Sequence, residues 1–572
     1  MGQPTLSASV TSQRSSSRAE LERAVGELSS QARTFARLDA AARAALVRAC
    51  IPRVLDVAPA WSRNGLSVKG LPGQSGEEWL AGPLPTVRSL RLLAESLDSI
   101  ATTGRPRLGT SQQERADGRL TIDVFPDAAL DRVLYSGYTA SVLMQEGVDR
   151  QAAEDAQAAS YQSSDPPGRV ALVLGAGNVS SIPATDVLTL MFNEGMVCLL
   201  KMNPVNEWVG PYLERAFEPL IAPGFLRVVY GGGDVGQQLA EHDGVDHVHL
   251  TGSVTTHDSL VWGPAGPESD RRRALDEPLL EIPITSELGN VTPIAVVPHR
   301  YTDAALAFQA RNVATMVANN ASFNCVAAKV IVTGRGWSQR DAFLGLVADS
   351  LSRMPTRRAY YPGARERYQL LTAGRAGVEK IGRPAQGQLP WAIIHDVDPG
   401  DPEDPLFRTE PFCPIVSETA LGSADPAEFL AAATTFMNDS LWGTLSAGII
   451  IDPRLERDPV VAAALDRALV DLRYGNIAVN CWTGLNYALM SLPWGSHPST
   501  SRQDVGSGLG WVHNTFMLGR VDKAVVRGGL RMRPAPVWFA DNPKAGRAGP
   551  ALVSMEAEPG WRRLPALLRS LL

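Results

Sequence analysis

Apolar and polar positions alternate most regularly between residues 170 and 251, where short apolar runs are separated by stretches of helical periodicity. The apolar runs predict strands at 170–174, 197–200, 226–230 and 247–250. The intervening stretches predict helices at 183–193, 207–221 and 235–241. Strands joined by crossover helices form a parallel sheet, which commonly binds a nucleotide. The pattern therefore predicts an α/β protein with a parallel-sheet nucleotide-binding domain.

Similar periodicity outside this region predicts further helical and strand segments. Residues 19–97 carry apolar stripes at helical spacing, and residues 301–317 carry another. A short apolar run at 330–332 predicts a buried strand. We therefore expect an N-terminal helical part and a second α/β domain.

A separate β arm is predicted from residues 120–144. Residues 120–125 alternate as a strand does, and a Pro126-Asp127 turn leads into a second apolar segment that begins at Leu134. Such a ribbon before the main fold is an unusual core element and a plausible arm. We expect the C-terminal segment 525–539 to join it.

The loop between the 301–317 helix and the 330–332 strand is polar and contains one cysteine, Cys325. A loop at such a junction can hold a thiol at the surface of a cleft, within reach of substrate and a neighbouring base. The alternative is an inert core cysteine, because isolated free cysteines are usually buried. Residues elsewhere in the chain favour a nucleophile.

The composition limits the domain count and the classes of partner. A chain of 572 residues is too long for one core, so two or three domains are expected. The formal net charge of -6 argues against nucleic acid as a partner, because no basic excess neutralises phosphates. The five cysteines are scattered, and neither a CxxC pair nor Cys/His spacing for zinc is present. This predicts a reducing, cytoplasmic location and no metal site.

The first residues carry no secretory signal. Residues 1–18 are rich in Ser and Thr and lack an apolar core, which predicts a disordered tail, with an organelle transit peptide as an unsupported alternative. The chain contains no run of about 18 apolar residues, so no membrane span is expected.

Three glycine-containing turns lie between predicted strands and helices. Gly175-Ala-Gly177-Asn178 resembles a dinucleotide fingerprint only weakly, and in a competing interpretation Asn178 is an amide donor near an active site. A second turn contains Gly233 and Gly236, and a third contains Gly252 and Ser253. Each of the latter two can present backbone N–H groups to a phosphate.

Five positions in a fixed order then identify a family resemblance. They are Asn178, Lys201, Gly252 within Thr-Gly-Ser, Glu287 within Glu-Leu-Gly, and Cys325. With this order the chain resembles the aldehyde dehydrogenase superfamily, from about residue 19 to about residue 539. The order continues in later motifs, at Glu410-Pro-Phe-Cys-Pro414, Asn438 to Ala447, Gly475 to Asn480 and Pro493-Trp-Gly495.

The resemblance implies covalent catalysis. Cys325 would attack an aldehyde carbon, with the Asn178 amide and the Cys325 N–H as donors to the oxyanion. Glu287 would activate the water that hydrolyses the thioester. Each residue also has a plain interpretation, since Glu287 can cap the turn at Gly289 and Asn178 can occupy a left-handed turn.

The resemblance also implies NAD or NADP as cofactor. Lys201 would hold the adenosine ribose and Glu410 the nicotinamide ribose, while Gly252 and Ser253 would lie against the pyrophosphate. The plain alternative for Lys201 is a surface lysine at a strand end. The expected cofactor site is completed by Gly233, Gly236, Leu288 and Phe412. The plain alternative for Phe412 is a core aromatic residue.

Departures from the family pattern affect the same region. Lys201 is followed by Met-Asn203-Pro rather than a motif containing glutamate, so the choice between NAD and NADP stays open. Residues 263–270, with the basic run Arg271 to Arg273, predict an exposed insertion whose charges are solvated or meet a large anionic substrate. Other departures occur at His257, Asn290 and Cys413.

The expected function is oxidation of an aldehyde to an acid. A reductase of acyl thioesters is the alternative, and Glu287 argues against it because water must be kept from such a thioester. A catalytically silent binding protein with the same fold is the third hypothesis. Phe323 and Trp482, near the cysteine, suggest that the substrate pocket is not strongly polar.

The expected domain order follows from these motifs. The boundaries are a tail at 1–18, a cofactor domain at 19–290 containing the arm at 120–144, a catalytic domain at 291–480, a return segment at 481–539 and an extension at 540–572. By resemblance the arm pairs with a neighbouring subunit, which implies a homodimer or homotetramer. The extension lies outside the resemblance, and the plain expectation is a small docking helix.

Overall fold

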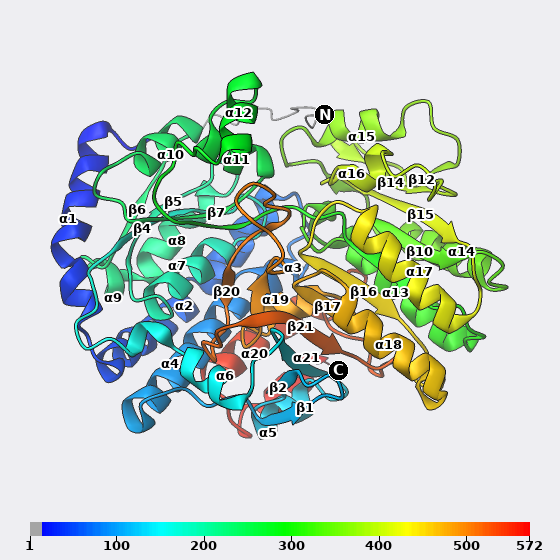
Figure 1. Cartoon of the computed structure of the whole chain (residues 1–572), viewed down its shortest axis with the longest axis horizontal. Helices are drawn as coiled ribbons and strands as arrows, with labels where there is room; N and C mark the ends of the chain where they lie inside the picture. The colour runs from blue at the N-terminus through cyan, green and yellow to red at the C-terminus, as the bar shows by residue number, and fades with distance from the viewer. Residues whose placement is uncertain (1–13, 572) are drawn as a thin grey trace.

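The computed structural model describes residues 14–571, so most of the tail expected at 1–18 lies outside the described residues. Two sheets with helices on their faces form the two halves of the molecule (Figure 1). The N-terminal helices cover the half built on the smaller sheet, and the arm and the C-terminal helices lie below the junction (Figure 1). The fold is α/β, as the sequence predicts.

A six-stranded sheet forms the first half, in the order β19-β8-β7-β4-β5-β6. The strands after β19 run parallel to one another, which is the arrangement that the predicted alternation of strands and helices requires. The strands are β4 (Val170–Leu174), β5 (Val197–Lys201), β6 (Leu226–Val229), β7 (His247–Thr251), β8 (Ile284–Glu287) and β19 (Gly508–Leu509). The helices are α7 (Ile182–Phe192), α8 (Gly210–Ala216), α9 (Glu218–Ile221), α10 (Gly233–Ala240) and α11 (Val254–Trp262).

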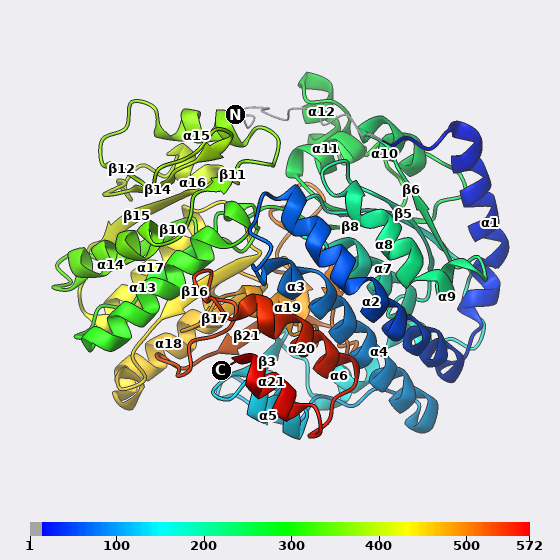
Figure 2. The same ribbon diagram turned by 180° about the vertical axis from the view of Figure 1, so that it is seen from behind.

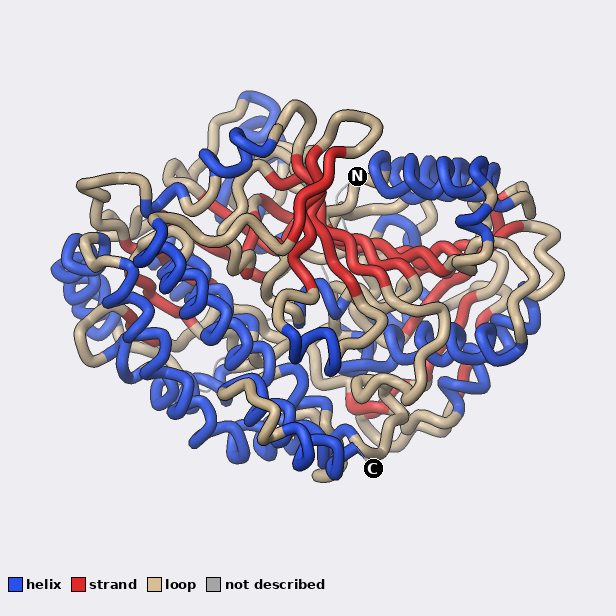
Figure 3. Tube along the Cα trace, turned by 90° about the horizontal axis from the view of Figure 1, so that it is seen from below, coloured by secondary structure: helices blue, strands red, loops and turns tan. Residues whose placement is uncertain are grey.

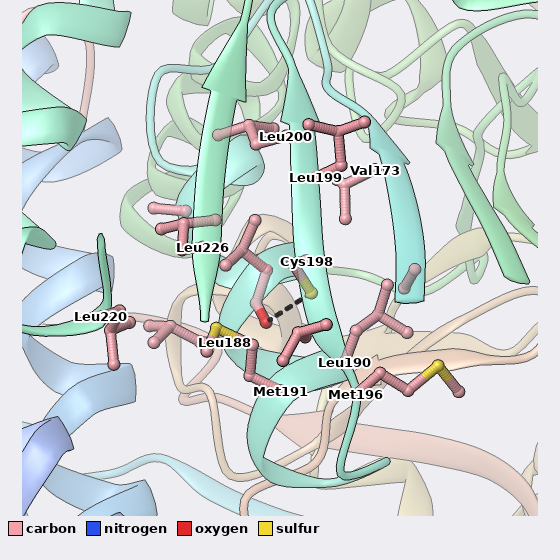
Figure 4. Close-up of a cluster of buried hydrophobic side chains, with 14 of the residues drawn as sticks. Val173, Leu188, Leu190, Met191, Met196, Cys198, Leu199, Leu200, Leu220 and Leu226 are labelled. Atoms are coloured by element: carbon pink, nitrogen blue, oxygen red, sulfur yellow. Dashed lines mark hydrogen bonds between the residues drawn. The ribbon is translucent and has the colours of Figure 1, made fainter. Parts of the chain in front are cut away.

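The core of this half lies between the sheet and α7. Val173, Leu188 and Leu199 belong to one cluster of buried side chains (Figure 4). Cys198 lies within that cluster and its thiol donates to the carbonyl of Val187 at 3.9 Å (Figure 4). Burial raises the pKa of this thiol, so Cys198 is an inert core cysteine.

Four helices precede the sheet: α1 (Arg18–Ala36), α2 (Ala40–Val68), α3 (Glu77–Ala81) and α4 (Pro83–Thr103). The Ser17 side chain caps α1 and Asp39 caps α2, so polar residues fix both starts. The predicted helical part at 19–97 corresponds to these elements.

An eleven-stranded sheet forms the second half, in the order β1-β2-β3-β21-β17-β16-β9-β10-β15-β14-β12 (Figure 3). Its central strands are parallel, whereas both ends are antiparallel. The central and β12-side strands are β9 (Pro293–Val296), β10 (Val330–Gly334), β12 (Val378–Ile381), β14 (Trp391–Ile394), β15 (Ile415–Leu421), β16 (Ser446–Ile450) and β17 (Asn476–Val479). The main helices of this half are α13 (Asp303–Ala318), α14 (Arg340–Ser352), α17 (Pro426–Asp439) and α18 (Pro459–Asp471).

The arm consists of β1 (Ser111–Glu114), β2 (Leu120–Phe125), β3 (Thr139–Met144) and β21 (Val521–Arg527). The expected second strand does not begin at Leu134, because that residue ends α5 (Ala129–Leu134) and the strand follows the turn at Gly137. β21 pairs with β3 on one side and with β17 of the same chain on the other. The arm thus joins the sheet of its own chain through β21, and its pairing with a neighbouring subunit stays a prediction.

The predicted insertion and the C-terminal extension are both helical. The predicted insertion at 263–270 leads into α12 (Pro267–Leu275), and the extension at 540–572 forms α20 (Ala545–Ala557) and α21 (Leu564–Leu571). Figure 2 shows α20 and α21, in red, between the N-terminal helices and the arm. No helix in residues 14–571 is long and apolar enough to cross a membrane.

The remaining elements are short. The helices are α6 (Arg150–Ala156), α15 (Ala364–Thr372), α16 (Pro405–Arg408) and α19 (Gly484–Ala488). The 3-10 turns are η1 (Ala159–Tyr161), η2 (Glu207–Val209), η3 (Asn319–Ser322) and η4 (Leu455–Arg457). The strands are β11 (Arg357–Arg358), β13 (Gln388–Leu389), β18 (Pro493–Gly495) and β20 (Trp511–His513).

Candidate active site

A strained loop carries Cys325. After α13 the chain passes through Asn320, Ala321 and Ser322, with φ of 51°, 54° and 69°, in the left-handed region. Such residues persist where the surroundings hold them, and they cluster at functional sites. The Asn320 amide donates to the carbonyls of Asn178 (3.0 Å) and Phe323 (3.1 Å), which fixes the turn.

Two further hydrogen bonds hold the cysteine backbone. The Thr292 hydroxyl donates to the carbonyl of Cys325 at 2.8 Å, and the Trp482 indole donates to the carbonyl of Val326 at 2.8 Å. Because both partners come from other strands and loops, the thiol is held on rigid elements. Cys325 is half-buried, whereas the other four cysteines are buried, and all five are free.

The Cys325 thiol faces Glu287. Its Sγ donates to Glu287 Oε1 at 3.7 Å. Burial, together with the negative charges of Glu287 and Glu410, raises the pKa of the thiol well above its ordinary value. The resting thiol is therefore protonated, and the nearest acceptor for its proton is Glu287.

Glu287 ends β8 and is itself buried, with 4% of its surface exposed. Burial and the nearby Asp186 carboxylate raise its pKa from 4.5 to about 7. Its second oxygen, Oε2, has no hydrogen-bond partner among the described residues. A carboxylate with a pKa near neutrality and a free oxygen suits a general base.

A buried polar network lies beside Glu287 on the same face of the sheet. Thr251 is its register partner on β7, and the Thr251 hydroxyl donates to Asp186 at 2.8 Å. His249, two residues earlier, lies 3.5 Å from Asp186 and 2.9 Å from the Thr285 hydroxyl. Sequence reasoning missed this network, although the alternation His-Val-His-Leu-Thr in β7 places its polar residues on one face.

Asn178 lies next to the cysteine loop. Its side-chain nitrogen donates to the carbonyl of Phe323 at 3.0 Å, and the residue is 8% exposed. An amide nitrogen carries two hydrogens, so one donor is left for another acceptor. The structure thus brings together Asn178, Glu287 and Cys325, three residues separated widely in sequence.

The residues expected to bind the adenosine and pyrophosphate groups lie at the carboxyl ends of β5, β6 and β7. Lys201 ends β5 and is 6% exposed; burial lowers its pKa to about 8, against the opposing effect of Asp234 and Glu207. Ser253 caps α11 and both it and Gly252 are exposed. Exposed N–H groups at this helix start suit an anion.

The glycines at α10 contribute differently to this edge. A Cβ at Gly233 would meet open space, whereas one at Gly236 would touch Leu174 at 3.4 Å. Gly233 is exposed at the helix start and Gly236 is buried against the sheet. Gly233 therefore faces the expected cofactor edge, and Gly236 serves packing. Leu288 is buried too, and its N–H donates to the carbonyl of Ser507 at 2.7 Å.

Glu410 and Phe412 approach the same junction from the second half. Glu410 packs against Gly289, where an added Cβ would lie 2.2 Å from its carboxylate. Burial raises its pKa to about 7, and its Oε1 has no hydrogen-bond partner among residues 14–571. An orphaned buried acceptor suits a sugar hydroxyl. Phe412, with φ of 40°, lies against the Tyr361 ring at 4.8 Å.

Lys329 was missed by sequence reasoning. Its buried Nζ donates to the carbonyl (3.0 Å) and hydroxyl (2.8 Å) of Ser322, within the strained turn. Burial lowers its pKa to about 8. Its position four residues after Cys325 was visible in the sequence, yet nothing local indicated that the side chain turns back to the loop.

Three departures from the family pattern have structural explanations. Asn203 accepts from the N–H of Val205 at 3.0 Å, so it closes a turn. Asn290 donates to the carbonyl of Ser446 at 2.8 Å, which ties the loop before β9 to the start of β16. The basic run on α12 is paired with acids, as in the Arg271 contacts with Glu268 and Glu277, and does not form a free anion site.

A cavity of about 690 Å³ reaches the cysteine. Cys325, Glu287 and Asn178 line one part of it, together with Trp482. Phe323 does not line it, because its ring is buried among Tyr360, Tyr361 and Phe412. Among residues 14–571, no cluster of three or more His, Cys, Asp or Glu could hold a metal ion.

Residues 127–359 match the model of the aldehyde dehydrogenase family. The matched segment contains Asn178, Lys201, Glu287 and Cys325. Over this segment the chain is similar in sequence to the aldehyde dehydrogenase family. No curated protein matches it in sequence.

Solved structures of this superfamily share the fold at low identity. Aldehyde dehydrogenase C of Pseudomonas syringae, solved with NAD+ and octanal, is 15% identical with a TM-score of 0.61, over 94% of this chain and 96% of that chain. The NADP-dependent glyceraldehyde-3-phosphate dehydrogenase of Bacillus halodurans is 17% identical with a TM-score of 0.59, over 91% and 95%. Aldehyde dehydrogenase 21 of Physcomitrella patens, in complex with succinate, is 12% identical with a TM-score of 0.60, over 91% and 94%.

Proposed function

We propose that the protein oxidises an aldehyde to a carboxylic acid with NAD or NADP, through a thioester on Cys325. The observation that carries the proposal is the 3.7 Å contact between the Cys325 thiol and Glu287 at the wall of a cavity. Covalent catalysis needs a nucleophile within reach of a base, and this pair meets that condition.

The first task of the pair is thiol activation. Because the thiol is protonated at rest, its proton passes to Glu287 as sulfur bonds to the aldehyde carbon. The carbonyl electrons move to oxygen, and the free N–H of Asn178 and the backbone N–H of Cys325 stabilise that charge. Fixed donors of this kind cost little reorganisation during the reaction.

Bound NAD or NADP supplies the acceptor for the hydride that leaves the former aldehyde carbon. The residues present fit such a group. Lys201 would donate to the adenosine ribose, the N–H groups at Gly252 and Ser253 would meet the pyrophosphate, and the orphaned oxygen of Glu410 would accept from the nicotinamide ribose. The structural relatives from P. syringae and B. halodurans, solved with NAD+ and with NADP, support this assignment.

The second task of Glu287 is hydrolysis. Once it has returned its first proton to solvent, its ionised carboxylate takes a proton from water as the water oxygen attacks the thioester. The acid leaves and the thiol is restored. The presence of this carboxylate at the thiol favours hydrolysis over transfer to a second thiol, and so favours the dehydrogenase over the acyl-thioester reductase.

We also propose that the protein is cytoplasmic and forms a homo-oligomer. Five free cysteines suit a reducing compartment. Because the arm pairs with β17 of its own chain, a dimer or tetramer would have to use another surface or exchange the arm. Light scattering of the purified protein, with a mass above 61.3 kDa expected, tests the oligomer.

Formation of reduced cofactor tests the catalytic proposal. Purified protein is mixed with aliphatic and aromatic aldehydes and with NAD or NADP, beside a Cys325→Ser variant. We expect absorbance of reduced cofactor without added coenzyme A, and none in the variant. Cofactor consumed only with acyl-CoA would instead establish the reductase, and silence in both assays with a reactive thiol would favour a binding protein.

A further inference from the structure

The C-terminal extension, which lies outside the family resemblance, lines the cavity that reaches Cys325. α20 contributes Leu552, and α21 contributes an apolar face to the same wall. The residues of that face are Leu564, Leu567, Leu568 and Leu571. The extension therefore belongs to the substrate side of the molecule rather than forming a detached docking helix.

α20 is fixed to the body of the protein by buried charge. The Glu556 carboxylate lies between Arg88 (2.6 Å) and Arg91 (2.7 Å) of α4, and all three are largely buried. At the start of α20, a Cβ on Gly546 would lie 1.9 Å from the carbonyl oxygen of Gln74, so the two backbones touch. The Lys544 ammonium donates to the carbonyl of Leu571 at 2.7 Å, which ties the end of α21 to the start of α20.

The wall around α21 is apolar and comes from distant parts of the chain. It combines side chains from α4, the arm helix α5, the loop after β21 and the extension. Examples are Leu84, Val133, Trp538, Leu552 and Leu567. Val133 and Leu568 are among the exposed large apolar residues, with 49% and 51% of their surface accessible. Exposed apolar residues that meet at a cavity mark a ligand site more often than isolated ones do.

Charged groups in the wall are neutralised by ion pairs. Arg357 pairs with Glu77 at 2.9 Å, and Asp541 pairs with Arg311 at 2.7 Å. Apart from Glu287, one charged lining residue has no ion pair among the described residues. This residue is Arg533, which is exposed. A charged substrate tail would thus meet one cation at most, whereas a hydrocarbon tail would meet apolar surface along the wall.

We propose that the extension and the arm helix form a binding site for the apolar tail of the substrate, so that this protein prefers aldehydes with long hydrocarbon chains. The proposal rests on the proposed function and names its substrate class. Cavities of 300–1,000 Å³ hold ligands of roughly drug size, and at about 690 Å³ the space greatly exceeds that of a two- or three-carbon aldehyde. The aldehyde carbon would lie at Cys325 and the tail would run to α21.

Burial of each added methylene predicts a measurable slope. At about 0.8 kcal/mol per buried CH₂, kcat/KM rises roughly fourfold per carbon while the tail stays inside the wall. A site for short aldehydes would show no such rise. A site that uses Arg533 would instead favour aldehydes that carry a terminal carboxylate over apolar aldehydes of equal length.

The test is a chain-length series from propanal to dodecanal, with aldehydes bearing a terminal carboxylate as a second arm. The wild type is compared with Leu568→Asp, which places charge at the α21 wall, and with Leu370→Asp as the matched control. Leu370 lies on α15, is 53% exposed and does not line the cavity. Neither side chain is buried, so neither substitution removes core packing.

We expect the ratio of kcat/KM for dodecanal over propanal to exceed a hundredfold in the wild type and in Leu370→Asp. In Leu568→Asp the ratio should fall at least tenfold. If short aldehydes are oxidised and kcat/KM does not rise with chain length, the tail site is overturned while the dehydrogenase proposal stands. If the carboxylated aldehydes are preferred, the apolar tail site is overturned in favour of a site that uses Arg533.

A binding measurement separates the two proposals when no aldehyde is oxidised. Decanol, which cannot react with the thiol, is titrated into the Cys325→Ala protein and followed by tryptophan fluorescence, since Trp482 and Trp538 line the cavity. Saturable binding that weakens at least tenfold in the Leu568→Asp background supports the tail site independently of catalysis. No binding, or equal binding in both backgrounds, would overturn it.

Discussion

The two ends of one cavity are built in opposite ways. Around Cys325, groups are polar, buried and densely hydrogen-bonded, and Glu287 keeps an oxygen without a partner. Around α21 the wall is apolar, its charges are paired, and Leu568 stands half exposed. Unsatisfied buried polar groups carry a free-energy cost that a reaction can use, whereas apolar surface offers only burial. In the two proposals, the first end therefore determines which reaction occurs, and the second end determines which substrate is held.

Glu287→Gln should have the largest effect at the polar end. Removing the base at near-constant volume should lower kcat about 10²- to 10⁴-fold for every aldehyde, because general-base catalysis contributes that range. Intact-mass spectrometry after one turnover should show an acyl group retained on the protein. Unchanged kcat would mean that another group serves as base.

Asn178→Ala should lower kcat about 10²- to 10³-fold, the usual cost of one oxyanion donor. If the two ends work separately, the factor will be the same for propanal and dodecanal. The measurement is kcat for both substrates. A loss that depends on chain length would show that Asn178 positions the tail rather than stabilising charge.

Glu556→Gln tests the buried ion pairs that hold α20, and with it the apolar end of the cavity, against α4. It leaves Arg88 and Arg91 with less buried negative charge, and breaking a buried ion pair costs about 3–5 kcal/mol of unfolding free energy. Urea unfolding should report this loss. The matched control is Glu558→Gln, an exposed partner of Arg563 in the same extension, for which about 0–1 kcal/mol is expected. Equal losses would mean that α20 is held by packing alone.

The pH profile tests the environment of Glu287. The carboxylate works when ionised, so kcat should fall as pH drops through its pKa of about 7. Asp186→Asn removes a negative charge that raises this pKa, and the acidic limb should move to lower pH. Asp270→Asn, at an exposed site on α12, should leave the limb in place. A limb unmoved by Asp186→Asn would exclude Asp186 as a cause.

The smallest expected effect concerns the cofactor. Asp234 and Glu207 act on the charge of Lys201, so the 2′-phosphate of NADP would meet negative charge and NAD should bind better. Asp234 is exposed, so its charge is screened by solvent. Asp234→Asn should therefore reduce the preference for NAD over NADP by up to about fivefold. The ratio of the two cofactor KM values is the readout. An initial preference for NADP would contradict this interpretation.

The polar end was largely predictable because its residues sit at element junctions. β5 is a continuous apolar run up to Leu200, so Lys201 at its end stands out from the pattern, and Gly252 follows the last residue of β7. The prediction that a strand begins at Leu134 was wrong. Leu134 ends the short helix α5, which has too few residues for periodicity to distinguish a helix from a strand. The pattern predicts that residues 521–527 form a strand but not which edge that strand joins, and the fold places it beside β17.

The sequence by itself determined the α/β fold and the candidate site residues, because strand and helix periodicity and short motifs are local properties. Only the tertiary structure decided that Lys329 turns back to the strained loop, that the Asp186 carboxylate lies near Glu287, and that the extension lines the cavity. The contact of Arg88 with Glu556 joins residues 468 positions apart, and it depends on the packing of α20 on α4 rather than on any local preference. A stretch outside the motifs that carry the resemblance thereby becomes part of the wall of the cavity that reaches Cys325.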